Sequence, residues 1–157
     1  MICWRIGAET RSWRADDLGG KGAALYPGRW NDKGEAMVYA AQTRSLCVLE
    51  TAAHVDSAGF PLNRFLVEIR IPDELWEARE LADPAQLDPA WSAIPAGMAS
   101  VRYGSAWLLS RRSLLLIVPS VIVPEEPVVL INPGHPDASR LSAKVVRKFE
   151  YDLLFRP

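Results

Sequence analysis

The sequence predicts an α+β fold, built from small mixed or antiparallel sheets with flanking helices. Strand and helix patterns do not alternate regularly along the chain. Two strand patterns, 114–118 and 128–131, follow each other too closely for a crossover helix between them. Both observations disfavour a doubly wound fold. We expect two small sheets that meet at an angle.

The length and composition are those of one globular domain, which we expect to span residues 1–157. The chain has 157 residues, of which 49% are hydrophobic and 24% charged. A domain of this size buries roughly 70% of the surface that its unfolded chain exposes. The sequence is therefore long enough to form a substantial core.

Charge and segment patterns exclude several classes of protein. The net charge is −1, whereas nucleic-acid-binding domains are typically basic. We therefore expect no direct contact with nucleic acid. The first residues do not form a signal peptide, and the longest apolar run, after Ser113, is short and interrupted by proline. We expect a cytoplasmic protein without a membrane segment. Cys3 and Cys47 lack metal-site spacing and are expected to be buried free thiols, with no metal bound.

Hydrophobic periodicity predicts the elements of the first half. Alternation predicts strands at 2–6, 36–41 and 64–71. In the second of these, Met37 and Tyr39 should face one side while Val38 and Ala40 face the other. In the third, Phe65, Val67, Ile69 and Ile71 should share a face. A helix is expected over 43–55, capped by Thr43 or Ser45, with an apolar stripe at Leu46, Leu49 and Ala53.

The second half combines a loop-rich segment with a helix and three strands. Prolines and alanines over 72–99 predict a loop with short helical turns. The pattern over 102–112 is typical of a helix. Strands are expected at 114–118, 128–131 and 148–155.

Glu50 is the most informative polar residue. On the expected helix it neighbours Leu46, Cys47, Ala53 and His54. A carboxylate on the apolar side of a helix has to be paired, hydrogen-bonded or functional. The structural alternative is an ion pair with His54 or Arg44, because such pairs produce similar arrangements.

Arg29 lies in a glycine-rich stretch, 16–36, within the sequence YPGRWN. Glycines such as Gly28 let a backbone approach a ligand closely, and arginine presents a planar fork that matches phosphate oxygens. These features indicate a nucleotide or phosphorylated ligand, although the spacing is neither that of a P-loop nor that of a Rossmann fingerprint. The structural alternative is a surface arginine stacked on Trp30.

Four further residues have both a functional and a structural interpretation. Tyr39 could stack on a flat ring or be a core tyrosine with a bonded hydroxyl. Ser120 follows an apolar strand and could also be a turn serine. Asn132 and His135, in LINPGHP, could bind substrate or fix the turn. Ser120, His135 and Asp137 together suggest a serine hydrolase, but the sequence has no G-x-S-x-G elbow to support it.

Taken together, these motifs resemble the RES-domain family, named for its Arg, Glu and Ser. The resemblance runs from WRI at Trp4 almost to the end of the chain. The sequences that carry it are GKGAALYPGRWN, MVYAAQTRSLCVLETAAHV, VEIRIPDEL, GSAWLLSRRSLLLIVPSVIVPEE, LINPGHP and FEYDLLF. Their order and spacing carry the resemblance more than any single motif does.

The resemblance implies a fold similar to ADP-ribosyltransferases and a toxin of a toxin–antitoxin pair. Such toxins consume NAD⁺ as a substrate, by hydrolysis or phosphorolysis, and some transfer ADP-ribose to a host protein. The implied partner is an Xre-like antitoxin encoded beside the toxin. No further cofactor is implied.

The family's arginine, glutamate and serine correspond to Arg29, Glu50 and Ser120, and its strand tyrosine to Tyr39. These four are the predicted catalytic residues. The predicted substrate-binding residues are Gly28, Trp30, Asn31, Asn132 and His135. The alternative from another class is a non-catalytic nucleotide-binding module that uses the same cleft, and a serine hydrolase based on Ser120 is a third hypothesis.

Overall fold

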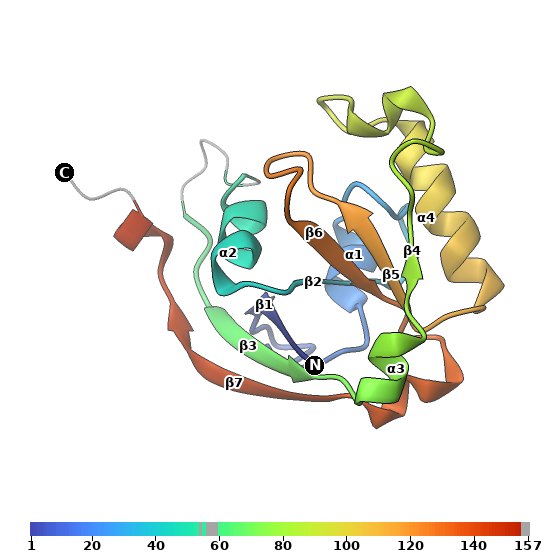
Figure 1. Ribbon diagram of the computed structural model, residues 1–157. Helices are drawn as coiled ribbons and strands as arrows, with labels where there is room; N and C mark the ends of the chain where they lie inside the picture. The colour runs from blue at the N-terminus through green and yellow to red at the C-terminus, as the bar shows by residue number, and fades with distance from the viewer. Residues whose placement is uncertain (54, 56–59, 155–157) are drawn as a thin grey trace.

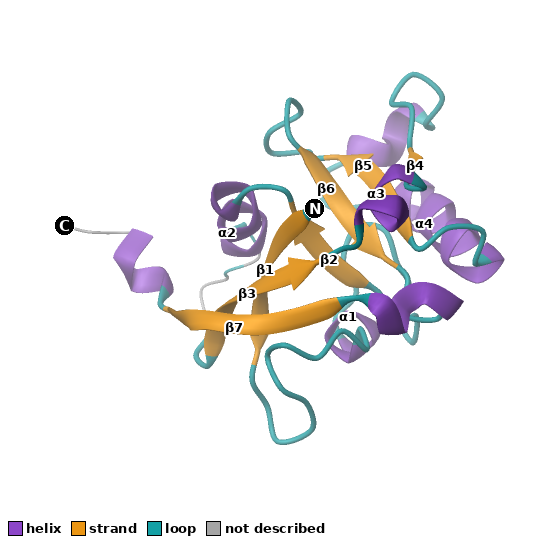
Figure 2. Cartoon of the chain, turned by 60° about the horizontal axis from the view of Figure 1, so that its bottom comes forward, coloured by secondary structure: helices purple, strands orange, loops and turns teal. Residues whose placement is uncertain are grey.

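A computed structural model of the chain describes residues 1–53, 55 and 60–154. Helices flank a seven-stranded sheet, so the predicted α+β class is confirmed (Figures 1 and 2). The strands are β1 (Ile2–Ala8), β2 (Val38–Ala41), β3 (Arg64–Arg70), β4 (Glu80–Leu81), β5 (Leu115–Pro119), β6 (Pro127–Ile131) and β7 (Ser142–Phe149). The α-helices are α1 (Lys21–Leu25), α2 (Arg44–Ala52), α3 (Asp73–Glu77) and α4 (Met98–Ser110). Three short 3-10 helices are η1 (Pro89–Ser92), η2 (Pro136–Arg140) and η3 (Tyr151–Leu154).

The strands form one sheet, and the expectation of two separate small sheets is wrong. Their order is β4-β5-β6-β2-β1-β3-β7, with antiparallel pairing except between β4 and β5. The central junction is narrow, because β1 and β2 pair only at Trp4 and Ala41. By contrast, β1 and β3 pair over seven positions. The strand pairing between the two halves seen in Figure 1 thus consists of one pair of residues, and side chains packed on the sheet also connect them.

One face of the sheet carries a continuous apolar core. Phe65, Val67, Ile69 and Ile71 pack together on this face, as their alternation predicts. Val38 and Ala40 of β2 and side chains of β5 and β6 belong to the same cluster. Burial of this alternating set fixes the register of β3 against β1, because a slip by one residue would turn every apolar side chain outward.

The opposite face is covered in two separate parts, and this division positions the functional residues. Trp107 and Leu108 of α4 pack over β5 and β6. Leu46 and Cys47 of α2 pack over β1 and β3. Met37 and Tyr39 point to this face, as predicted. The strand β2 therefore lies where the two covers meet, with α2 on one side and α4 on the other (Figure 1).

Several predicted boundaries need correction. The second strand begins at Val38 rather than at residue 36, and the helix predicted over 102–112 begins at Met98. That helix ends at Ser110 because Arg111 takes a left-handed conformation, with φ 49°. The predicted stripe on α2 is correct at Leu46 but wrong at Leu49 and Ala53, which are exposed, and Cys47 completes the buried side.

The last strand differs most from its prediction. It spans Ser142–Phe149 instead of 148–155, and the following described residues form η3. Most of β7 is exposed because it is an edge strand, and its exposed side chains, which include Val145 and Val146, do not alternate between apolar and polar. Tyr151 then packs edge-on against Phe149, with ring centroids 5.0 Å apart, and contributes to the core beneath α2.

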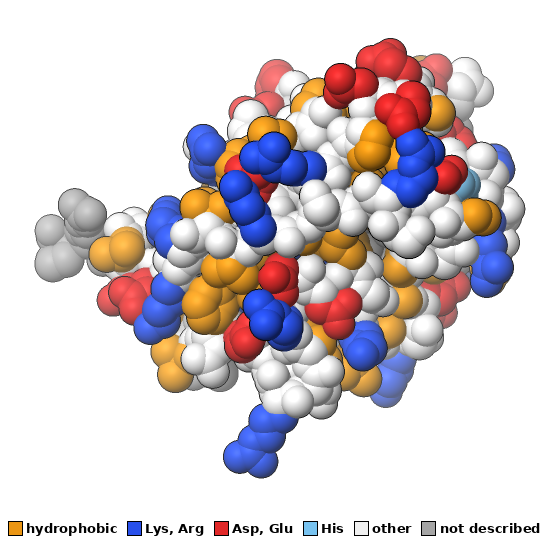
Figure 3. Space-filling view, turned by 90° about the horizontal axis from the view of Figure 1, so that it is seen from below, with side chains coloured by type: hydrophobic (Ala, Val, Ile, Leu, Met, Phe, Trp, Pro, Cys, Tyr) orange, Lys and Arg blue, Asp and Glu red, His pale blue; other side chains and the backbone are white. Residues whose placement is uncertain are grey.

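The surface shows no basic stripe on the face seen in Figure 3, where acidic and basic side chains are interspersed. Ion pairs also form within β3 and between neighbouring strands, because Glu68 of β3 accepts from Arg70 at 2.8 Å and lies 3.4 Å from Lys144 of β7. In the described part of the chain, no helix is long and apolar enough to cross a membrane. Cys3 and Cys47 are buried free thiols, as expected.

Candidate active site

Glu50 lies in the last turn of α2 and is half-buried. The helix begins at a capped terminus, because the Thr43 hydroxyl accepts the Leu46 N–H at 3.1 Å. The same hydroxyl donates to Glu126 at 2.7 Å, which ties the start of α2 to the loop between β5 and β6. A carboxylate in the last turn faces the negative end of the helix dipole, an unfavourable position unless other groups stabilise the charge.

Ser120 supplies that stabilisation. Its hydroxyl donates to Oε1 of Glu50 at 2.5 Å, although the two residues are 70 positions apart. The same oxygen accepts the backbone N–H groups of Ile122 at 3.1 Å and Val123 at 3.0 Å. Because two N–H groups occupy the oxygen's lone pairs, its single proton is directed at Glu50. Ser120 is 1% exposed, so it holds the carboxylate from the protein side.

Arg29 lies within electrostatic range of Glu50. Burial lowers the pKa of the Arg29 guanidinium, and the negative charge of Glu50 opposes that effect. No ion pair joins the two side chains in the described part of the chain, so a ligand between them would not have to break one.

The Arg29 guanidinium is anchored through one nitrogen only. Its Nη1 donates to the backbone carbonyl oxygens of Trp91 at 2.9 Å and Ala93 at 2.8 Å. Within residues 1–53, 55 and 60–154, no group accepts from Nε or Nη2. These two nitrogens form the edge of the fork that binds phosphate or carboxylate oxygens in pairs.

The loop that carries Arg29 is fixed by Tyr39, Gly28 and Asn31. The Tyr39 hydroxyl donates to Oδ1 of Asn31 at 2.7 Å and accepts the Trp30 N–H at 3.0 Å. Gly28 lies against the tyrosine ring, and a Cβ at this position would be 2.6 Å from Cζ of Tyr39. Burial raises the pKa of Tyr39, so its hydroxyl stays neutral. Tyr39 thus holds the Arg29 loop, and one side of its ring is covered.

Asn31 is fully buried and is the centre of this loop. Its Oδ1 accepts from Gly28 and Tyr39, and its Nδ2 donates to the carbonyl oxygens of Ala23, Asp32 and Glu35. All of its polar capacity is used inside the chain. The structure therefore places Asn31 as a support of the loop and leaves it no free group for a ligand.

Trp30 packs beneath the loop. It is 2% exposed, stacks on Trp91 with ring centroids 5.9 Å apart, and meets Tyr103 of α4 edge-on at 6.1 Å. Close approach to α4 requires Gly104, where a Cβ would be 1.8 Å from the Trp30 carbonyl oxygen. Trp30 thus orients Arg29 through the backbone, and the Arg29 guanidinium binds the carbonyls of the η1 segment.

Asn132 and His135 are not brought to this cluster. They follow β6, at the end of the β5–β6 pair opposite to Ser120. Asn132 donates to the Leu108 carbonyl at 2.8 Å and accepts the Gly134 N–H at 2.9 Å, and His135 Nδ1 accepts the Asp137 N–H at 3.2 Å. These contacts fix the turn and the end of α4, which is the structural alternative considered for both residues.

The same separation argues against a serine hydrolase. Ser120 and His135 lie at opposite ends of the β5–β6 pair, and the Ser120 proton is already directed at a carboxylate. Of the proposed structural partners of Glu50, Arg44 instead lies over the Trp4 ring, 3.8 Å from its centroid. His54 lies outside the described residues.

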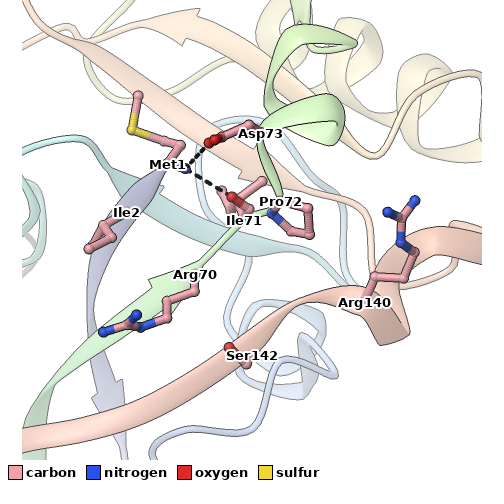
Figure 4. Close-up of a pocket in the computed structure, with 8 residues that line it drawn as sticks. All are labelled: Met1, Ile2, Arg70, Ile71, Pro72, Asp73, Arg140 and Ser142. Atoms are coloured by element: carbon pink, nitrogen blue, oxygen red, sulfur yellow. Dashed lines mark hydrogen bonds and ion pairs between the residues drawn. The ribbon is translucent and has the colours of Figure 1, made fainter.

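The pocket drawn in Figure 4 lies elsewhere in the molecule. It has a volume of about 370 Å³ and is formed by Met1, Ile2, Arg70, Ile71, Pro72, Asp73, Arg140 and Ser142. The amino group of Met1 donates to Ile71 O at 2.9 Å and Asp73 Oδ1 at 2.8 Å across it (Figure 4). None of the predicted site residues contributes to this pocket. In addition, no three His, Cys, Asp or Glu side chains in the described part of the chain are arranged to hold a metal ion.

Comparison with known families identifies the scaffold that carries this cluster. The model of the RES domain matches residues 2–154. The chain belongs to the RES domain family. Arg29, Glu50 and Ser120 of this RES protein, separated widely in sequence, are thus gathered on one side of the sheet between α2 and the η1 segment.

Similar proteins include curated relatives and a solved structure. A protein of Sphingobium sp. (strain YBL2) named "Prs ADP-ribosylating toxin" is 54% identical over 149 residues, which cover 95% of this chain and 92% of that protein. A "Toxin Res" of Yersinia enterocolitica is 38% identical, with 86% of each chain covered. The solved M. tuberculosis MbcT–MbcA toxin–antitoxin complex contains a chain with the same fold, at a TM-score of 0.60 and 16% identity, covering 93% of this chain and 84% of that one.

Sequence reasoning missed the partners of Arg29 and of Ser120. Arg29 is held by the carbonyl oxygens of Trp91 and Ala93, and Ser120 accepts the N–H groups of Ile122 and Val123. All four partners are backbone groups, and a sequence motif gives no sign of which backbone groups will bind a side chain. The only available signal was Trp91, an isolated tryptophan in a segment rich in proline and alanine.

Proposed function

We propose that this RES protein is the toxin of a toxin–antitoxin pair and that it consumes NAD⁺ by cleaving the nicotinamide–ribose bond. The observation that carries the proposal is the Glu50 carboxylate, held by Ser120 and within electrostatic range of Arg29. The family and the names of two relatives similar in sequence support the same role.

The chemistry of this bond matches the residues present. Its cleavage releases neutral nicotinamide and leaves positive charge on the ribose. A fixed carboxylate stabilises that charge in the transition state, where preorganised groups have their largest effect. Oε2 of Glu50 accepts no hydrogen bond from the described residues, so it is the oxygen that would face the ribose.

Arg29 would bind the pyrophosphate. Its free Nε–Nη2 edge matches two phosphate oxygens, while Nη1 keeps the side chain anchored. Tyr39, Gly28 and Asn31 would act by holding the Arg29 loop. Ser120 would act by orienting Glu50. NAD⁺ is the substrate in this scheme, and no other cofactor takes part.

Water, phosphate or a protein side chain could accept the ADP-ribose. Because a relative with 54% identity is named an ADP-ribosylating toxin, we propose transfer to a host protein alongside hydrolysis or phosphorolysis. A toxin that depletes NAD⁺ would act in the cytoplasm and would need a neutralising partner. We propose an Xre-like antitoxin encoded beside it, which provides any DNA contact, because this chain has a net charge of only −1.

The test is a product analysis of the purified protein with NAD⁺. Free nicotinamide should appear, with ADP-ribose as the other product in buffer and its phosphorylated form when phosphate is present. Labelled NAD⁺ in cell extract should transfer label to a protein. Expression should lower cellular NAD⁺ and arrest growth, and co-expression of the neighbouring reading frame should restore growth. Unchanged NAD⁺ both in vitro and in arrested cells would contradict the proposal.

A further inference from the structure

The η1 segment is attached directly to Arg29, the arginine proposed to bind the pyrophosphate. Asp88 caps the turn by accepting the Ala90 N–H at 2.8 Å, and the Trp91 N–H bonds to the Asp88 carbonyl at 2.8 Å. Arg29 then donates to the carbonyls of Trp91 and Ala93. The neighbours of Trp91 within the segment are exposed, so the Trp91 side chain and the hydrogen bonds from Arg29 attach the segment to the core.

Trp91 has one covered and one open side. Its ring stacks on Trp30 at an interplanar angle of 21°, and Trp30 is buried. Trp91 itself is only half-buried. Part of the Trp91 side chain therefore reaches solvent while the ring packs on a buried ring. It does so in the segment whose backbone carbonyls bind the Arg29 guanidinium.

The segments that carry Glu50, Arg29 and Trp91 determine how these residues are arranged across the molecule. Glu50 lies on α2, on one side of β2, and Trp91 lies in η1, beside α4 on the other side (Figure 1). Arg29 interacts with both regions, because its guanidinium binds the Trp91 carbonyl and the charge of Glu50 opposes the lowering of its pKa by burial. A dinucleotide has the same order: a ribose that reacts, a pyrophosphate, and a second nucleoside.

We infer that Trp91 is the stacking surface for the adenine base of the dinucleotide. This inference rests on the proposed function, since the substrate is NAD⁺ with its reacting ribose at Glu50 and its pyrophosphate at Arg29. Stacking suits this position because a base presents a π-face to an aromatic ring without requiring a particular hydrogen-bond pattern. Trp30 preorganises the ring, so little side-chain freedom is lost on binding.

The experiment compares two substrates and one binding probe. Trp91→Leu keeps apolar packing on Trp30 but removes the aromatic face, and Trp91→Phe keeps a smaller face. Trp13→Leu is the control, because Trp13 is another half-buried tryptophan, in the loop after β1. Nicotinamide release is measured with NAD⁺ and with nicotinamide mononucleotide, which lacks the adenylate half. AMP binding is measured by calorimetry, independently of any cleavage.

Trp91→Leu should raise the KM for NAD⁺ and the Kd for AMP by about 10- to 100-fold, which corresponds to ~1–3 kcal/mol for one stacked base. The kcat and the reaction of nicotinamide mononucleotide should be unchanged. Trp91→Phe should show a smaller change, and Trp13→Leu none.

The outcomes separate this inference from the proposed function. If the wild type cleaves NAD⁺ but Trp91→Leu keeps its KM and its AMP affinity, the inference is overturned and the proposed function stands. If the wild type does not cleave NAD⁺ but binds AMP in a Trp91-dependent manner, the stacking surface is supported and the proposed chemistry is overturned. Failure of the wild type to bind AMP would overturn the inference.

Discussion

Replacement of Ser120 by alanine tests how the Glu50 carboxylate is held. The substitution removes the 2.5 Å hydrogen bond to Glu50 and leaves the N–H groups of Ile122 and Val123 without their acceptor. A hydrogen bond to a charged group contributes roughly 1.5–3 kcal/mol. If that interaction orients Glu50 in the transition state, its loss lowers kcat by about 10- to 150-fold.

The distribution of the effect between kcat and KM decides what Ser120 does. Because Ser120 is 1% exposed and its proton is directed at Glu50, it should not touch NAD⁺. Nicotinamide release, measured over a range of NAD⁺ concentrations, should therefore show a lower kcat at nearly constant KM. The unpaired N–H groups also lower stability, so the assay is run well below the melting temperature.

Ser113→Ala is the matched control. Ser113 precedes β5 at the end opposite to Ser120, and its hydroxyl is also fully engaged, accepting from Trp107 Nε1 at 2.8 Å. This variant should lose stability without losing kcat. A Ser120→Ala protein with a raised KM and unchanged kcat would refute the reasoning, because it would place the hydroxyl on the substrate. A variant with wild-type values for both would refute it as well.

Three further predictions concern the Arg29 loop and the fold. Arg29→Lys should raise the KM for NAD⁺ at least 10-fold in the same assay, because lysine has no planar edge for two phosphate oxygens. Gly28→Ala should lower the free energy of unfolding by roughly 1–3 kcal/mol in urea titrations and reduce activity, because the new Cβ would be 2.6 Å from the Tyr39 ring. Arg112 lowers the pKa of Glu80, so this pair stabilises the fold above the ordinary pKa of 4.5 and loses its effect as pH falls through the lowered value. Glu80→Gln should therefore lower the melting temperature at pH 7, and the difference from the wild type should shrink as the pH is lowered below 4.5.

The predictable parts of the fold are those where burial leaves a local pattern. The alternation over 64–71 correctly predicted which side chains of β3 share a face, and of the two predicted caps of α2, Thr43 and Ser45, the structure uses Thr43. The edge strand β7 was misplaced because its exposed side chains do not alternate in polarity. The sequence could not predict that the strands form one sheet. The pairing of β1 with β2 consists of Trp4 and Ala41 alone, and no local sequence pattern indicates that pair.

The candidate site shows a similar division. Glu50 stood out because a carboxylate interrupts an apolar helical face, and the structure brings it to Ser120 and near Arg29. Asn132 and His135 were grouped with the site because they lie in LINPGHP, one of the motifs of the family resemblance, and the structure uses them to fix a turn, the alternative stated for both. Residue type indicates which chemistry is available, whereas the topology of the β5–β6 pair decides at which end of the sheet it lies.

The most direct test of the central claim is the rate of nicotinamide release by Glu50→Gln, compared with the wild type. Glutamine keeps the size of the side chain and an oxygen that can accept from Ser120, but it removes the charge. The wild type should release nicotinamide from NAD⁺, and the folded variant should have a kcat lower by about 100-fold or more at nearly unchanged KM. A folded Glu50→Gln protein that releases nicotinamide at a near wild-type rate would contradict the account.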